Sequence, residues 1–219
     1  MRNPLFKTIL TAGRLLLLVT GNMILLTAIA VGQDAPGSTT EFDLHVNPKF
    51  VSCLGTGGPT PTAHVTVKRG NLSDTLTIEA HNIRPKLAFD MFTVQRSSLL
   101  FDGSPDPNFT NFGLAWYQSD LHASPKGDLK ASIKTILLDQ IFGFDPDAAL
   151  TPTNTFHVGF WFNDPNDANK NGCTFDVTHP TPFNGEHNAG PVAMISVPDK
   201  NTNLGPLCTN PNGNGTCNP

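Results

Sequence analysis

The sequence predicts an all-β protein: an antiparallel β-sandwich of immunoglobulin-like or jelly-roll type, with about 7–9 short strands. Three observations support this class. Charged residues make up only 15% of the chain, whereas Gly and Pro each occupy 19 of its 219 positions. Apolar and polar residues alternate with a period of two in several short runs. Loops rich in Gly, Pro, Asn and Asp separate these runs, as turns separate the strands of a sandwich.

The runs place the strands in order along the chain. They fall at residues 42–46, 63–68, 75–81, 87–94, 112–121, 129–134, 155–163 and 191–197. The second and third runs flank a turn at residues 69–71 and predict a hairpin with one buried face. The fourth run is apolar on both faces, which is typical of a central strand or of one packed between layers. Residues 136–144 fit a short helix or an irregular strand.

The first 32 residues have the pattern of an export signal. Basic residues precede an apolar stretch, and the stretch ends at Ala28-Ile29-Ala30 with the small residues that signal peptidase reads. Polar residues interrupt this stretch, which is short for a helix that spans a bilayer. We therefore expect residues 1–32 to be a cleaved signal peptide and the mature protein to be secreted. A flexible leader (33–40), the sandwich domain (41–200) and an Asn/Gly/Pro-rich tail (201–219) are expected to follow.

The charge of the mature chain excludes two classes of partner. Cleavage removes three of the 14 Lys and Arg residues and none of the 18 acidic residues, so the net charge falls to −7. Nucleic acids and anionic membranes are bound by basic surfaces. We expect neither as a partner after signal cleavage.

All four cysteines follow the export signal, and an oxidising compartment favours disulfides. Cys208 and Cys217 bracket a short turn-rich loop, which favours their pairing. That pairing leaves Cys53 with Cys173, a long-range bridge between the first strand region and a late loop. Two other pairings are compatible with the sequence.

Three segments of the chain resemble segments found in this order in a group of secreted bacterial proteins. They are Phe112-Gly-Leu-Ala-Trp-Tyr-Gln-Ser-Asp120, His157-Val-Gly-Phe-Trp-Phe-Asn-Asp-Pro165 and Thr181-Pro-Phe-Asn-Gly-Glu-His-Asn-Ala-Gly190. The shared patterns are AWYQxD, HxGxWFNxP and TPFNGxHxAG. The resemblance spans residues 60–197 and implies a common fold and export. It implies no activity, cofactor or catalytic residue.

One segment matches the start of a calcium-binding loop. Residues 167–172 read Asp-Ala-Asn-Lys-Asn-Gly, which fits D-x-[DN]-x-[DN]-G, but the twelfth position is Thr178 where an EF-hand has Glu. Calcium is thus the only candidate cofactor, in a site of low charge. Its expected ligands are Asp167, Asn169, Asn171 and Asp176. The same residues also suit an ordinary polar turn.

Aromatic residues provide the candidate ligand-binding surface. In the strand at 155–163, alternation places His157 and Trp161 on the same face as Gly159, while Trp116 and Tyr117 lie on opposite faces of their own strand. An exposed Trp or Tyr beside Gly is a platform on which a sugar ring stacks. The same rings also suit the packed faces of a sandwich.

No catalytic signature emerges from the sequence. It has no G-x-S-x-G or H-E-x-x-H, and its seven histidines lack the spacing of a metal site. We expect a non-catalytic binding or cell-surface interaction module with a carbohydrate or an envelope component as its ligand. The alternatives are an extracellular hydrolase with its site at residues 157–187, and a structural matrix protein that associates through an open sheet edge.

Overall fold

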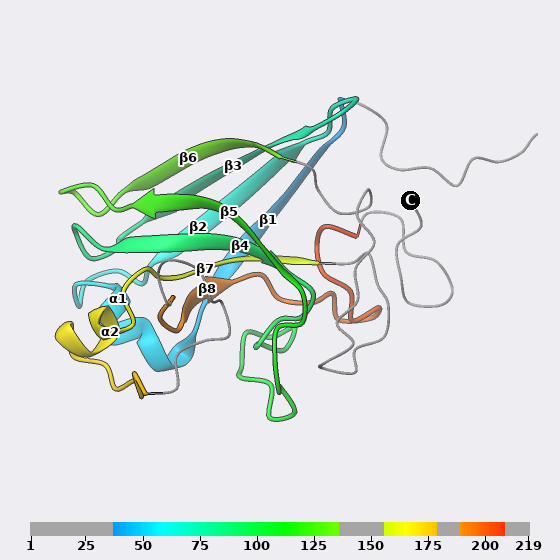
Figure 1. Cartoon of the computed structure of the whole chain (residues 1–219). Helices are drawn as coiled ribbons and strands as arrows, with labels where there is room; N and C mark the ends of the chain where they lie inside the picture. Colours follow the sequence, from blue (N-terminus) through cyan, green and yellow to red (C-terminus); the bar gives the residue numbers. More distant parts are fainter. Residues whose placement is uncertain (1–36, 136–155, 179–188, 209–219) are drawn as a thin grey trace, which may run out of the picture. The chain divides into compact units, whose positions relative to one another are not determined.

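The computed structural model describes residues 37–135, 156–178 and 189–208, which form an all-β domain (Figure 1). The strands are β1 (Thr39–Val46), β2 (Thr62–Lys68), β3 (Asp74–His81), β4 (Ala88–Val94), β5 (Ala115–His122), β6 (Leu129–Thr135), β7 (His157–Phe162) and β8 (Val192–Ile195). The short helices are η1 (Pro48–Phe50), α1 (Val51–Leu54) and α2 (Asn166–Lys170). None of these helices is long and apolar enough to cross a membrane.

The strands form one antiparallel sheet in the order β5-β4-β7-β8-β1-β2-β3-β6. β1 joins the two halves of this sheet, because its first six residues pair with β2 and its last two pair with β8. The sheet is nearly closed: Gln118 of edge strand β5 accepts a 2.6 Å hydrogen bond from the Thr135 hydroxyl of edge strand β6. The all-β class is therefore confirmed, with a single barrel-like sheet as its form.

The alternating runs become strands because each puts one face into the core. In β2, Ala63, Val65 and Val67 are buried and alternate with more exposed polar residues. The predicted hairpin with β3 is present, and a buried ion pair fixes its turn: Arg69 donates to Asp74 at 2.8 Å. Desolvation of the two charges offsets much of their attraction, so the pair adds little net stability.

β4 is buried on both faces, as its sequence predicted. Phe89 and Met91 belong to the main core, whereas Phe92 and Val94 belong to a second apolar cluster. The two pairs occupy alternate positions of the strand and therefore lie on opposite faces of the sheet. The strand lies between β5 and β7 and is therefore central in its half of the sheet.

The observed boundaries differ from the sequence prediction at several points. β1 begins at Thr39, within the expected leader, because Thr39 and Thr40 pair with the end of β2. β5 begins at Ala115, three residues later than expected. The short helices were not predicted. Residues 136–144, like the signal segment, lie outside the described residues.

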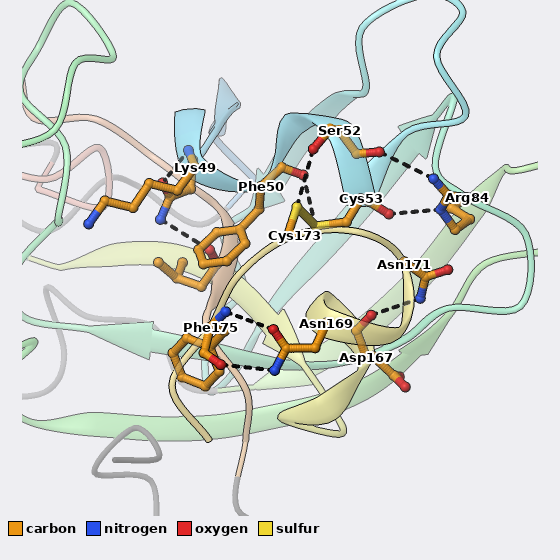
Figure 2. The surroundings of a disulfide bond; sticks show 12 residues. Lys49, Phe50, Ser52, Cys53, Arg84, Asp167, Asn169, Asn171, Cys173 and Phe175 are labelled. Atoms are coloured by element: carbon orange, nitrogen blue, oxygen red, sulfur yellow. Dashed lines mark hydrogen bonds between the residues drawn. A yellow bond between two sulfur atoms is a disulfide. The ribbon is translucent and has the colours of Figure 1, made fainter. Parts of the chain in front are cut away.

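A disulfide between Cys53 and Cys173 confirms the predicted long-range bridge and joins the segments that carry α1 and α2 (Figure 2). Arg84 strengthens the same junction, because its guanidinium donates to the carbonyls of Ser52 and Cys53. Cys208 is also disulfide-bonded, and its predicted partner Cys217 lies outside the described residues. The bridge constrains a separation of 120 residues, which limits the freedom of the unfolded chain.

Candidate functional site

Trp161 does not provide the expected exposed platform. Its side chain is 0% exposed and packs edge-on against Phe92 and Phe112, at centroid distances of 5.4 and 5.0 Å. Gly159 makes room for this ring, since a Cβ there would lie 3.1 Å from Trp161 and 2.9 Å from the carbonyl of Met194. The glycine beside the tryptophan therefore serves internal packing.

The two aromatic residues of β5 differ in their exposure. Tyr117 is 55% exposed, and its hydroxyl donates a 2.8 Å hydrogen bond to Asp120. Desolvation and this hydrogen bond raise the pKa of Tyr117 to about 12. Trp116 is half-buried and packs on Phe156 at 5.0 Å. Of the four expected ligand-binding residues, Tyr117 alone has an exposed ring.

His157 is a buried structural residue. Its Nδ1 lies 3.1 Å from both the carbonyl oxygen and the hydroxyl of Ser196. Burial lowers the pKa of His157 to about 4, so the ring is neutral at ordinary pH. The expected hydrolase segment, residues 157–187, also contains His179, Glu186 and His187, which lie outside the described residues. A neutral ring enclosed at the start of β7 has no access to a substrate from solvent.

The segment expected to bind calcium forms α2 and the turn after it. Asn169 uses both of its side-chain polar atoms on the backbone of Phe175, at 2.8 Å each (Figure 2). Asn171 donates to the carbonyl of Asp167, whose carboxylate accepts from Lys170, and Asp176 accepts from Thr178. Within the described ranges, no group of three or more His, Cys, Asp or Glu side chains could hold a metal ion.

A groove of about 720 Å³ lies on the solvent face of β1, β2 and β3. We call it the β1–β3 groove. Short apolar side chains from η1, α1 and the loop before β2 form part of its wall. Its polar lining consists of three histidines, three carboxylates and two threonines: His45, His64, His81, Asp43, Glu79, Asp102, Thr60 and Thr62.

Strand register places the polar side chains of the groove in a row. Asp43, His64 and Glu79 are direct cross-strand partners on β1, β2 and β3. The row ends on β6 at Lys130, which pairs with Glu79 and also forms an ion pair with it. His64 donates from Nδ1 to Asp43 at 2.8 Å, and its Nε2 lies 3.9 Å from Glu41. Oppositely charged and hydrogen-bonded cross-strand pairs stabilise a sheet face modestly.

A second histidine pair and a loop complete the groove. His81 faces Thr62 across the strands and donates from Nδ1 to Asp128 at 2.8 Å. The loop at Asp102 and Gly103 approaches His45 closely: a Cβ on Gly103 would lie 2.9 Å from the imidazole. Gly103 also has φ of +81°, a conformation that favours glycine. Glycine at position 103 therefore allows this loop to lie close to the His45 side chain.

Neighbouring groups lower the pKa values of two carboxyl groups of the groove. The Lys130 ammonium holds the pKa of Glu79 below its ordinary value, and hydrogen bonds from Ser104 do the same for Asp102. A glycosidase needs one carboxyl group whose pKa is raised so that it can donate a proton. In the part of the chain that the structure describes, neither His64 nor His81 is hydrogen-bonded to a hydroxyl or thiol nucleophile.

His64, Glu79 and His81 lie in the runs predicted as strands at residues 63–68 and 75–81, and they were not among the expected site residues. The predicted hairpin places these residues on neighbouring strands, but the pairing of His64 with Glu79 requires a connection at residues 69–74, which is longer than the turn expected at residues 69–71. The contribution of Asp43 from β1 required the strand order. Comparisons with known proteins find no family model, curated protein or solved structure that matches this chain.

Proposed function

We propose that this protein is a secreted, non-catalytic binding module that holds a carbohydrate in the β1–β3 groove. The observation that carries the proposal is the polar cross-strand row of Asp43, His64 and Glu79 on the floor of a large open groove. Sugar hydroxyls need several hydrogen-bonding groups at fixed positions. A row held by strand register supplies them without the flexibility of a loop.

A carbohydrate fits this surface better than an extended peptide does. Peptides that bind sheets usually add a strand to an unpaired edge. β2 crosses the floor of the groove, and it pairs with β1 on one side and with β3 on the other. Its backbone groups are therefore already used in the ladders, and recognition must come from side chains.

Two features support binding without cleavage. The carboxyl groups of Glu79 and Asp102 have lowered pKa values, so both remain ionised and neither is a proton donor at neutral pH. The two imidazole–carboxylate pairs lack a hydrogen-bonded nucleophile among the described residues. The export of the protein rests on residues 1–32, which are outside the described ranges.

The test is binding of the purified protein, at pH 7.5, to an array of neutral, amine-bearing, uronic-acid and sulfated oligosaccharides. The strongest hit is then measured by calorimetry with His64→Ala, and with His122→Ala as the matched control. His122 is an exposed histidine on β5 that does not line the groove. We expect His64→Ala to weaken binding about tenfold and the control to leave it unchanged.

Three results would overturn this function. The first is an array without hits, and the second is release of shorter sugars from the bound oligosaccharide. The third is loss of binding in Tyr117→Ala but not in His64→Ala, which would place the ligand on the exposed ring of β5.

A further inference from the structure

We infer that the β1–β3 groove selects uncharged, hydroxyl-rich sugar chains that lie across the strands, and that it rejects uronic-acid and sulfated glycans. This inference rests on the proposed function and specifies the class of carbohydrate. It follows from the signs of the charges in the groove, from its hydrogen-bonding groups and from the direction of its polar row.

The charged groups of the groove oppose an anionic ligand. Three carboxylates line it, from Asp43, Glu79 and Asp102, and none of its described lining residues is Lys or Arg. The nearby Lys130 is paired with Glu79. Recognition of carboxylate and sulfate groups generally uses Arg or Lys, so an acidic sugar would meet like charge with no Lys or Arg in the described lining to offset it.

The groove offers mainly hydrogen-bond acceptors. His64 and His81 use Nδ1 to donate to Asp43 and Asp128, and the three carboxylates of the lining offer further acceptor oxygens. Carboxylates are acceptors only when ionised. Hydroxyl groups of a neutral sugar supply the matching donors, and hydrogen bonds to a carboxylate are stronger than those between neutral groups.

The orientation of the polar cross-strand row predicts the orientation of a bound sugar chain. Asp43, His64 and Glu79 lie on three successive strands, and neighbouring strands are about 4.8 Å apart. Thr62 and His81 form a neighbouring polar pair in the same direction. This spacing is comparable to the length of one pyranose unit, so a chain across the strands places about one sugar on each. Affinity should therefore rise from monosaccharide to trisaccharide.

The first test is the class of the hits on the oligosaccharide array. Neutral glycans should be the strongest ligands, and for the best one the affinity should rise at least tenfold from one to three units. Binding should change less than twofold between 50 and 500 mM NaCl, because salt screens only charged partners. Uronic-acid, sulfated or amine-bearing glycans as the strongest ligands would overturn this inference and leave the proposed function intact, whereas an array without hits would overturn both.

The second test is a change of charge at constant shape. Asp43→Asn should weaken the best neutral ligand about tenfold, because a carboxylate acceptor is replaced by an amide. The matched control is Asp120→Asn, since Asp120 is exposed on β5 and does not line the groove. Asp43 is exposed, so the variant should keep the melting temperature of the parent. Equal affinities for both variants and the parent would overturn the assigned role of the groove carboxylate.

Discussion

Acidification should destabilise this protein through His157. The ring is buried, and its pKa in the folded state is about 4, compared with 6.5 for an ordinary histidine. Between these pH values the unfolded chain binds a proton that the folded chain does not. The contribution of the neutral His157 ring to the unfolding free energy is fully present above about pH 6.5 and is lost as the pH falls towards 4.

The size of this effect follows from the difference in pKa. At about 1.4 kcal/mol for each pH unit, lowering the pKa from 6.5 to about 4 corresponds to roughly 3 kcal/mol of unfolding free energy. That amount is a large share of the stability of a typical domain. The physical cause is desolvation, since a protonated ring at this position would lose its hydration.

The assay is urea unfolding at pH 7.5, 6.5, 5.5 and 4.5, followed by the fluorescence of the two tryptophans. His157→Asn retains a hydrogen-bond donor near Nδ1 but does not titrate. The parent should lose about 2.5 kcal/mol more than this variant between pH 7.5 and 4.5, because the loss is complete only below the folded-state pKa of about 4. The difference between the two curves removes the contributions of the other histidines. His122→Asn, at an exposed position, should behave like the parent.

If the parent and His157→Asn lost the same stability over this range, the reasoning would be refuted. Such a result would mean that the buried ring does not control the acid sensitivity of the fold. A variant that failed to fold would be replaced by His157→Gln, and the comparison of pH slopes would be the same.

Three further predictions concern packing and the late loop. Replacing Cys53 and Cys173 together by Ala should lower the unfolding free energy by about 4 kcal/mol, because the bridge closes a long loop; a loss below about 1 kcal/mol in urea unfolding would contradict this. Gly159→Ala should cost about 2 kcal/mol and shift the tryptophan emission to the red, because its Cβ would meet Met194 and Trp161. The control Gly58→Ala should leave the unfolding free energy unchanged, because a Cβ at Gly58 would meet no atom within 4 Å. Equal losses of stability in the two variants would argue against a packing role for Gly159. Millimolar calcium followed by EDTA should leave the melting temperature unchanged, because the Asn169 side chain is already hydrogen-bonded to the backbone of Phe175. A rise in melting temperature with calcium would show instead that residues 167–176 bind the ion.

Local patterns predicted most of the strands because burial on one face imposes a period of two. The hairpin of β2 and β3 followed from the order of residues along the chain, and the Cys53–Cys173 bridge was the favoured one of three pairings that the sequence allowed. The short helices did not, since α1 and α2 have only 4 and 5 residues and depend on their surroundings.

The candidate site was harder to predict because exposure is a tertiary property. An exposed ring and a buried ring can have the same local sequence, and Trp161 is buried because residues far apart in the chain, among them Phe92 and Phe112, pack around it. The motif at residues 167–172 has the composition of a calcium loop, yet its side chains bond to the backbone of α2 and the turn. Composition alone does not distinguish these two uses of Asn and Asp.

Alternation and a short turn are local properties, so the residue pattern predicted the all-β class, the hairpin and the outward direction of His64 and Glu79. That Asp43 joins them in one row, and that the loop at Gly103 borders the same groove, is seen only in the folded chain. Strand order and loop position depend on contacts between residues far apart in the chain. The free energy of those contacts comes from the shared core, which no local pattern encodes.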